Sequence, residues 1–435
     1  MMKKNKNNPN ILRTESSQEN SNTSRRSFLG TLGLGVASLS LAQIGCSAQK
    51  KTGSSQPVGA DGKVIAGFDE IGEETKDIHA NWVAVSDRKV KVGLVGYGLC
   101  EFAAEFGFQD HPNVEVVAVS DLFPDRCAKL AERARCNKKY PSLEEMVKDD
   151  SIEAIYIATD PPNHAKHAIL ALNHGKHVAV AVPAIFGSLE EADELYNAVK
   201  RSGKKYMMFE TSCFREDLYA MKQIYNAGGF GKVLYSEGEY IHYLDKPLPS
   251  YKGWRDGAPP MFYLTHATAY YVGVTGGYFT EVSCYGEKSN RNDLTKGGKN
   301  KYNNSYATQA GMFKCDNGSF SRMMFSRDIA GLGAEVGKIR GELGSYERGK
   351  GYGGLRKSQL PNTKRPPLPP GMRPGGHGGS HGHLTEEFIR AILEDRQPLV
   401  NIAQALNMSI PGIIGHQSCL KGGETLQIPH YTMWV

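Results

Sequence analysis

The chain has 435 residues, 40% of them hydrophobic, and a formal net charge of +6 at pH 7. A single hydrophobic core usually stops growing below this length, so we expect about two packed domains plus tails. The positive charge is modest and lies largely at the N-terminus and in one late loop, whereas a nucleic-acid-binding protein concentrates Lys and Arg along one element. A nucleic acid is therefore not expected as a partner.

The N-terminal segment has the pattern of an export signal. Ser24-Arg25-Arg26-Ser27-Phe28-Leu29 precedes a moderately apolar run over residues 28–45, which is typical of the Tat route for folded proteins. Glycines and polar residues interrupt the run, which favours a signal over a membrane span of about 20 apolar residues. We predict a Tat signal over residues 1–46 and a periplasmic or otherwise exported protein. Ile44-Gly45-Cys46 leaves open a lipoprotein anchored through acylated Cys46.

Residues 47–88 are rich in Gly, Ser, Lys and Asp and show little periodicity, which predicts a linker. From Lys89 onward, short apolar strands alternate with segments of helical spacing. The predicted strands are 90–95, 114–119, 154–158, 177–180 and 206–209, and the predicted helices begin at 99, 124, 163 and 189. This alternation predicts an α/β Rossmann domain over residues 89–209, with a parallel sheet covered on both faces.

The pattern changes after residue 210. Alternating segments at 233–240, 279–285, 306–313 and 320–325 predict a second α/β domain, residues 210–435, built on a large mixed or antiparallel sheet. A basic Gly/Pro-rich stretch at 346–381 is expected to be a solvated loop, followed by helices at 385–393 and 402–414. The seven cysteines beyond the signal show neither C-x-x-C nor zinc spacing, so we expect buried free thiols and no metal site.

Gly96-Tyr97-Gly98-Leu99 joins the first predicted strand to its helix. Gly96 permits a tight bend, and Gly98 lets the backbone approach a pyrophosphate at the helix N-terminus. Glu101 stands where the usual third glycine would be, so the fingerprint is incomplete. Asp121 ends the second strand, where a carboxylate accepts hydrogen bonds from the adenosine ribose and repels a 2′-phosphate. NAD is therefore favoured over NADP, although Arg126 lies close enough to leave NADP open.

Export in the folded state bears on how such a cofactor is held. A dinucleotide is scarce outside the cytoplasm, so a folded protein that leaves the cell must carry its dinucleotide tightly bound. We expect a cofactor that is regenerated within each turnover and not exchanged.

Three further segments resemble the Gfo/Idh/MocA family of dinucleotide oxidoreductases: Ala158-Thr159-Asp160-Pro161-Pro162-Asn163-His164, Gly175-Lys176-His177-Val178 and Val182-Pro183. The resemblance runs from about Lys89 to the C-terminus. It implies that Thr159, Asn163, His164 and Pro183 contribute to the cofactor site. The chain is most similar to the branch with NAD-dependent α-N-acetylgalactosaminidases, through Val182-Pro183-Ala184, Met207-Met208-Phe209-Glu210, Tyr240 with His242, Trp254-Arg255, Tyr263-Leu264-Thr265-His266 and Gly375-Gly376-His377-Gly378-Gly379.

The resemblance implies an enzyme that acts on a carbohydrate. In that branch, bound NAD transiently oxidises a sugar carbon, the glycosidic bond is eliminated and the hydride returns, whereas other members simply oxidise or reduce a sugar or cyclitol hydroxyl. Members often assemble as dimers or larger oligomers, so a homo-oligomer is expected.

His266 is the expected catalytic acid or base, because an imidazole titrates near working pH and can take a hydroxyl proton. Tyr263, three residues earlier, would share its face on a helix and is the second expected catalytic residue, which could share that proton or orient the sugar. Without the resemblance, a histidine in an aromatic-rich helix would more often be structural. Tyr240, His242 and Arg255 are expected to bind substrate, with a surface salt bridge as the alternative for the last two.

Two departures from the family pattern affect the predicted chemistry. Ala181-Val182 replaces the usual Glu-Lys pair before Pro183, and Phe214 stands where the galactosaminidase-like branch has a tyrosine. A phenyl ring has no proton to transfer. The sequence therefore favours an NAD(P)-dependent sugar oxidoreductase, and it leaves open a redox-assisted glycosidase and a noncatalytic sugar- or dinucleotide-binding protein.

Overall fold

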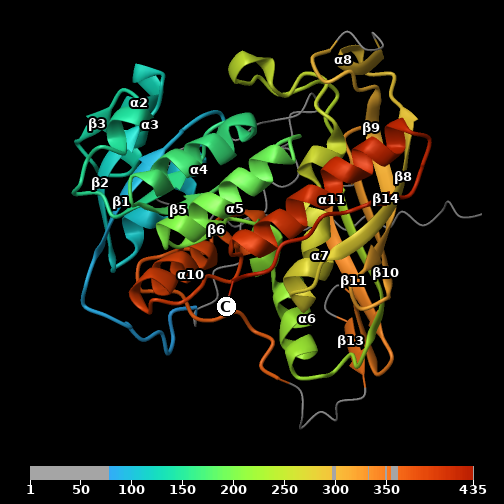
Figure 1. Ribbon diagram of the computed structural model, residues 1–435. Coiled ribbons are helices and arrows are strands. Elements are labelled where there is room, and N and C mark those ends of the chain that lie inside the picture. The colour runs from blue at the N-terminus through green and yellow to red at the C-terminus, as the bar shows by residue number, and fades with distance from the viewer. Residues whose placement is uncertain (1–77, 296–299, 332, 348–349, 354–360, 435) are drawn as a thin grey trace, which may run out of the picture. The chain divides into compact units, whose positions relative to one another are not determined.

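The computed structural model describes residues 78–295, 300–331, 333–347, 350–353 and 361–434 (Figure 1). The predicted signal, Cys46 and most of the predicted linker lie outside the described residues. Residues 78–88, the end of that linker, pack on the folded body. The Trp82 indole donates a hydrogen bond of 2.8 Å to Glu386, and the Leu368 N–H donates one of 2.8 Å to the Ile78 carbonyl. Within the described ranges, no helix combines the length and apolarity needed to cross a bilayer.

The first sheet confirms the predicted Rossmann unit (Figure 1). Its six strands are all parallel and have the order β3-β2-β1-β4-β5-β6. Every residue of β4 is buried, as expected for a strand with helices on both faces. The strands are β1 Val90–Val95, β2 Val114–Ser120, β3 Lys139–Tyr140, β4 Ala154–Ile157, β5 His177–Val180 and β6 Tyr206–Met208.

The predicted helices that begin at 124, 163 and 189 are confirmed, the first helix differs, and the short elements at 139–140 and 143–146 were not predicted. The apolar spacing after Gly98 predicts a longer helix than the single turn of α1, Phe102–Glu105. Glu101 and Gly107 adopt left-handed φ values of 55° and 73° on either side of it, which end the helix at both ends. The other helices are α2 Pro124–Arg133, α3 Leu143–Met146, α4 His164–Asn173 and α5 Glu190–Ser202, with short 3-10 turns η1 Phe108–Asp110 and η2 Pro161–Asn163.

The second sheet has eight strands in the order β13-β12-β11-β7-β10-β9-β8-β14. It is mixed, as predicted, because β7 and β10 pair in parallel while the other pairs are antiparallel. Burial alternates along β9, so one face is covered and the other is solvated. The strands are β7 Val233–Ile241, β8 Phe279–Lys288, β9 Tyr306–Cys315, β10 Phe320–Ser326, β11 Ala334–Gly341, β12 Gly344–Glu347, β13 Lys350–Gly353 and β14 Leu426–Gln427.

Helices α7 and α11 lie against this sheet and connect it to the Rossmann domain (Figure 1). Ten of the eleven residues of α7, Thr265–Thr275, are buried, and α11, Ile402–Leu420, contacts β8, β6 and α5. One apolar core therefore runs through both domains. The remaining elements are η3 Thr211–Phe214, α6 Glu216–Asn226, η4 Tyr251–Gly253, η5 Pro260–Tyr263, α8 Asn292–Thr295, α9 Gly376–Gly379 and α10 His381–Leu393.

The basic stretch at 346–381 differs from its prediction as a solvated loop. Strand β13 lies within it, and α9 follows at residues 376–379. The Arg365 guanidinium donates hydrogen bonds to the carbonyls of Phe214, Gly378 and Gly379 at 3.0, 2.9 and 2.7 Å, so buried backbone acceptors hold this part of the loop against the body. The sequence could not show those acceptors, because they come from separate elements.

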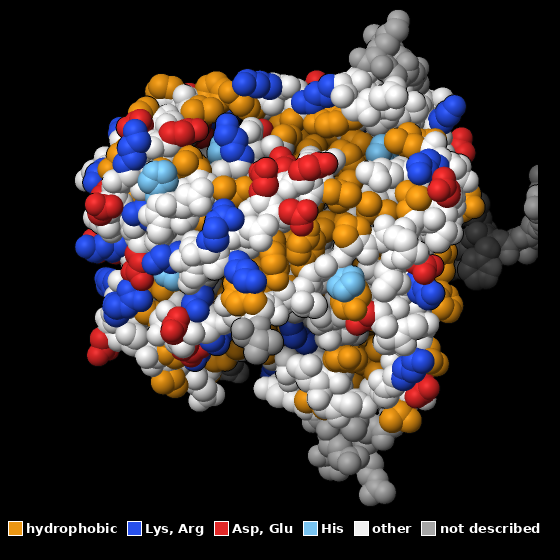
Figure 2. Space-filling view, viewed as in Figure 1, with side chains coloured by type: hydrophobic (Ala, Val, Ile, Leu, Met, Phe, Trp, Pro, Cys, Tyr) orange, Lys and Arg blue, Asp and Glu red, His pale blue; other side chains and the backbone are white. Residues whose placement is uncertain are grey.

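The cysteines match the expectation of free thiols. On the face shown in Figure 2, Lys and Arg side chains are interspersed with Asp and Glu, and no continuous basic patch is visible there. The seven cysteines from Cys100 to Cys419 are free, and six of them are buried.

Candidate active site

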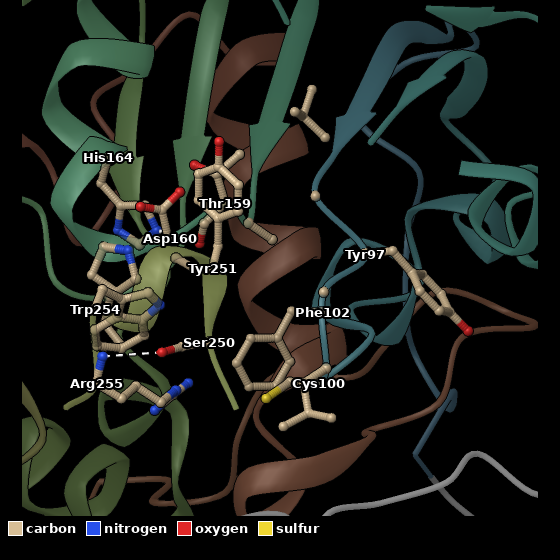
Figure 3. A pocket seen from close by; sticks show the side chains of 18 of the residues that line it. Tyr97, Cys100, Phe102, Thr159, Asp160, His164, Ser250, Tyr251, Trp254 and Arg255 are labelled. Carbon is tan, nitrogen blue, oxygen red and sulfur yellow. Dashed lines mark hydrogen bonds between the residues drawn. The ribbon is translucent and has the colours of Figure 1, made fainter. Parts of the chain in front are cut away.

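A pocket of about 490 Å³ lies between the ends of the Rossmann strands and the second sheet (Figure 3). The glycine loop and Asp121 line one part, and η4, Tyr263, His266 and the ends of β7 and β10 line another. Eight residues predicted to bind the cofactor line it: Gly96, Tyr97, Gly98, Leu99, Asp121, Arg126, Thr159 and His164. All five predicted catalytic or substrate-binding residues do so as well: Tyr240, His242, Arg255, Tyr263 and His266.

Asn163 and Pro183 are not among the lining residues of this pocket. The Asn163 amide donates to Asp160 at 2.7 Å, and Asp160 does line the pocket. The Pro183 carbonyl lies 2.8 Å from Nδ1 of His164. Both residues therefore support groups of the pocket wall from behind.

The geometry of the glycine loop suits a bound diphosphate. A Cβ on Gly96, whose φ is 90°, would lie 2.5 Å from the Ala158 carbonyl oxygen, so only glycine fits there. A Cβ on Gly98 would have no atom within 4 Å, so the space beside this backbone is open. The N–H groups of Tyr97 and Gly98 donate to Asp121 Oδ2 at 2.9 and 3.4 Å, which fixes the carboxylate at the edge of the loop.

Glu101 occupies the third position of the fingerprint with a left-handed φ of 55°, which is uncommon for a residue with a side chain. Its carboxylate lies 2.6 Å from Nη1 of Arg133, and Arg133 also reaches Glu105 at 2.5 Å. The ion pairs tie the turn to α2 and compensate for the missing glycine.

His266 lies in the first turn of α7, and its imidazole is buried against two carboxylates. Nδ1 lies 2.7 Å from Glu210, which follows β6, and 3.8 Å from Glu335 of β11. Burial by itself would lower the pKa of His266. The negative charges of Glu210 and then Glu335, together with the Glu210 hydrogen bond, outweigh it and raise the pKa to about 8.

Glu210, His266 and Glu335 bring three potential metal-ligand atoms within 4.8 Å of one another. Two contacts of Glu335 argue for a hydrogen-bonded relay instead. The Ser212 hydroxyl donates to Glu335 at 2.5 Å, and the Arg215 guanidinium lies 3.4 Å from it. A guanidinium at that place supplies the positive charge that a metal ion would bring, and it would repel the ion.

Aromatic and imidazole groups from β7 and η5 surround His266. The Tyr240 ring lies 4.5 Å from the His266 ring, and the Tyr240 hydroxyl lies 2.9 Å from Nδ1 of His242. Burial keeps the pKa of His242 well below its usual value, so His242 is neutral at pH 7. It is buried in the pocket, and the alternative of a surface salt bridge is wrong for His242.

Arg255 belongs to a stack of planar groups (Figure 3). Its guanidinium lies 4.2 Å from the Trp254 ring centre, and the Trp254 and Tyr263 rings stack at 5.9 Å and 12°. Among the described residues Arg255 forms no ion pair, so its charge is available to the pocket.

Four groups of this site were not predicted from the sequence: Glu210, Glu335, Arg327 and His377. Glu210 and His377 belong to segments that carry the family resemblance, and that was the available signal. His377 lines the pocket with a φ of 51°, and its ring stacks 6.5 Å from His266. Glu335 belongs to β11 and Arg327 directly follows β10, and neither residue is part of a motif.

The structure shows where the two departures from the family pattern lie. Ala181 and Val182 line the pocket, so apolar side chains stand where the family pattern has ionisable ones. Phe214 does not line it and instead stacks on His383 at 6.1 Å. Phe214 therefore belongs to the layer of aromatic and imidazole rings outside this pocket.

Residues 90–210 match the Gfo/Idh/MocA family, described as an oxidoreductase family with an NAD-binding Rossmann fold. The chain contains a Gfo/Idh/MocA-family domain. The predicted resemblance is thus confirmed for this part of the chain.

Curated relatives of the chain support the predicted branch. Glycosyl hydrolase family 109 protein 1 of Bacteroides fragilis (strain YCH46) is 34% identical over 178 residues, which cover 38% of this chain and 38% of that protein. The match therefore spans well under half of the relative.

Solved structures extend the similarity in fold beyond the Gfo/Idh/MocA domain. An NAD-binding oxidoreductase from Klebsiella pneumoniae gives a TM-score of 0.66 at 17% identity, over 80% of this chain and 100% of that one. Levoglucosan dehydrogenase in complex with NADH and L-sorbose gives 0.63 at 19% identity, over 79% and 99%. At these identities the likeness establishes a shared two-domain fold.

Proposed function

We propose that the protein is an NAD-dependent oxidoreductase that acts on a hydroxyl group of a sugar or sugar derivative and keeps its dinucleotide bound through turnover. The observation that carries the proposal is the single pocket that joins the glycine loop to the carboxylate-backed imidazole of His266. Levoglucosan dehydrogenase, whose fold is similar, was solved with NADH and a sugar, which supports this substrate class.

The residues present fit a dinucleotide. The open space at Gly98 admits a diphosphate beside the backbone, and Asp121 stands at the edge of the loop to accept hydrogen bonds from ribose hydroxyls. The negative charge of Asp121 favours NAD, because it repels a 2′-phosphate. When bound, NAD supplies a hydride acceptor, which no amino-acid side chain provides.

His266 is the group that moves the substrate proton. Glu210 holds Nδ1, so Nε2 faces the substrate and takes the hydroxyl proton during oxidation. With a pKa of about 8, the imidazole is mostly protonated at pH 7 and becomes a base as the pH rises above that value. Tyr263 stays protonated, since burial raises its pKa to about 12, and it orients the sugar as a hydrogen-bond donor.

The second candidate is redox-assisted glycoside hydrolysis, favoured by the glycosyl hydrolase family 109 relatives. It requires that a carbon-bound proton is removed after the oxidation and that the aglycone leaves. Ala181 and Val182 offer no base for that step, which is why we place oxidation first.

The test is to purify the protein without added nucleotide, identify the nucleotide it releases on denaturation, and record nicotinamide absorbance with a panel of hexoses and aryl hexosides. A lasting reduced-nicotinamide signal without aglycone release supports the oxidoreductase. Aglycone release without net reduction supports the glycosidase. Bound NAD with no response to any sugar supports a noncatalytic binding protein.

The site residue is tested by His266→Ala. Turnover should vanish while the nucleotide stays bound, because His266 moves the proton and the glycine loop holds the diphosphate. His416→Ala is the matched control, since this buried imidazole of α11 forms a hydrogen bond with Gln309 and does not line the pocket. Full activity in His266→Ala would remove His266 from the mechanism.

We also propose Tat-dependent export with the nucleotide already bound, supported by Arg25-Arg26 and the mild apolar run that follows. Arg25→Lys with Arg26→Lys should retain the protein in the cytoplasm. Labelling with palmitate, compared with Cys46→Ser, tests the lipid anchor. Normal export of the double variant would refute the Tat assignment.

A further inference from the structure

We propose that the pocket selects a sugar that carries an oxyanion, either a carboxylate or a sulfate ester, and that Arg327 binds this group with Arg255 as a second cation. The inference rests on the proposed function, because the oxyanion belongs to the same sugar whose hydroxyl meets His266.

Arg327 is a buried guanidinium without a counter-ion. It directly follows β10, lines the pocket and is 6% exposed. Among the described residues its side chain forms no ion pair and no hydrogen bond, and Nε is buried without a partner. Its neighbours are the faces of Phe325 at 5.0 Å and Tyr263 at 5.9 Å. A buried, unpaired charge is costly to folding, and such charges are normally paired.

The charges around Arg327 do not supply the missing counter-ion. Burial, followed by the positive charges of Arg255 and Arg291, lowers the pKa of Arg327 to about 10, so it remains a cation at neutral pH. Arg291 is paired with Asp293 at 3.1 Å. Arg255 has only the Trp254 ring, so two cations without carboxylate partners face this part of the pocket.

The nearby carboxylates are already engaged. Glu210 is held by His266 at 2.7 Å, and Glu335 is held by Ser212 and Arg215. Asp160 also lines the pocket, but it forms no ion pair with Arg327. A ligand can supply the missing negative charge.

The position of Arg327 assigns that ligand to the substrate and not to the cofactor diphosphate. The diphosphate site is the glycine loop after β1, whereas Arg327 directly follows β10 of the second sheet and contacts the ring of Tyr263, the partner of His266 in the proposed chemistry. A guanidinium presents parallel N–H donors that match two oxygens of one carboxylate or sulfate.

The experiment measures sugar binding to the NAD-loaded protein by isothermal titration calorimetry. Galactose, galacturonate and galactose 6-sulfate are compared, and so are glucose, glucuronate and glucose 6-sulfate. At least one anionic sugar should bind tenfold or more tightly than its neutral parent, and the better of the two anions identifies carboxylate or sulfate as the group. If both neutral parents bind as tightly as their anionic forms, the subsite is overturned while the proposed function stands.

Two variants complete the test. Arg327→Gln should abolish the preference for the anion and leave NAD retention unchanged. Arg322→Gln, in the strand that Arg327 follows but paired with Glu237 and Glu239 away from the pocket, should keep the preference. A preference that survives Arg327→Gln would overturn the role of Arg327. If no sugar binds although NAD is retained, the proposed function fails, and the subsite fails with it.

Stability gives a readout that does not depend on a sugar. Arg327→Met removes the unpaired buried charge and should raise the Tm of the sugar-free protein by a few degrees, because an apolar side chain of similar length suits the site better. Arg322→Met breaks two ion pairs and should not raise it. A lower Tm for Arg327→Met would show that the folded protein itself satisfies the charge, and would refute the inference.

Discussion

Replacement of Glu210 by Gln tests how the protein sets the pKa of the imidazole that we propose as the catalytic group. The carboxylate lies 2.7 Å from Nδ1 of His266, and with Glu335 it raises the pKa from 6.5 to about 8. That rise corresponds to about 2 kcal/mol in favour of the charged imidazole. Gln keeps the shape and removes the charge. Burial then acts against Glu335 alone at 3.8 Å, and the pKa of His266 should fall towards or below 6.5.

Protonation of His266 has opposite effects on the reaction rate and on the stability of the native state. In sugar oxidation the neutral imidazole is the active form, so kcat/KM of the wild type should rise with pH and level off above about 8, and in Glu210→Gln this rise should move to lower pH. Because the folded pKa is raised, protonation of His266 stabilises the native state fully below about 6.5, and this stabilisation is lost as the pH rises through about 8. Glu210→Gln should remove most of that pH dependence.

The assay combines kcat/KM profiles with histidine NMR titration of the NAD-loaded protein, which reports the pKa without turnover. Glu191→Gln is the matched control, because this partly buried carboxylate of α5 accepts from the Phe186 N–H and does not line the pocket. An unchanged pKa of His266 in Glu210→Gln would refute the assignment of Glu210 as the residue that holds and charges the imidazole.

Further predictions concern the dinucleotide half of the pocket. Gly96→Ala should destabilise the fold and release the nucleotide, because its Cβ would meet the Ala158 carbonyl at 2.5 Å, and thermal denaturation with nucleotide analysis checks both effects. In Gly98→Ala the added Cβ meets no atom within 4 Å, so the variant should fold, and its positive φ should cost about 1 kcal/mol of stability. The larger effect should be weaker retention of the nucleotide. Asp121→Asn should reduce the preference for NAD over NADP, measured by competition on nucleotide-free protein, since it removes the charge that repels a 2′-phosphate. An unaltered preference would show that Asp121 does not contact the ribose.

Five of the six strands of the Rossmann domain were predictable from sequence because they are apolar runs with mostly buried side chains, and every residue of β4 is buried. Strand β3, Lys139–Tyr140, was not predicted, because one exposed and one half-buried residue form no apolar run. Helix α1 was predicted too long for a local reason. Its apolar residues have helical spacing, but Gly107 ends the helix after one turn with a left-handed φ of 73°. Strand β13 was missed inside the basic stretch, because its four residues, Lys350–Gly353, carry no alternating apolar pattern. The spacing of apolar residues indicates which side chains are buried, whereas the ends of helices and strands depend on the backbone conformation of single residues.

The residues of the candidate site also fall into those that could be identified from the sequence and those that could not. The glycine loop, Asp121, Tyr263 and His266 were identified because each belongs to a short motif. Glu210 was not, since the sequence separates it from His266 by 56 residues and a carboxylate after a strand is as often a turn cap. It has that role too, as it accepts the Ser212 N–H at 3.0 Å. Arg327 could not be identified from the sequence, because only the three-dimensional structure shows that this cation has no ion-pair partner among the described residues.

The ionisable groups around the proposed substrate position favour oxidation over elimination. Burial holds the pKa values of His242 and His377 well below the usual value for histidine, and it raises that of Tyr240 well above the usual value for tyrosine. Ala181 and Val182 contribute no charge. Among the described residues of this half of the pocket, His266 is thus the proton-transfer group that titrates near neutral pH. Oxidation of a hydroxyl needs one base, whereas elimination needs a second, so kcat/KM should follow a single ionisation near 8. A bell-shaped profile with a second essential group would instead favour the glycosidase.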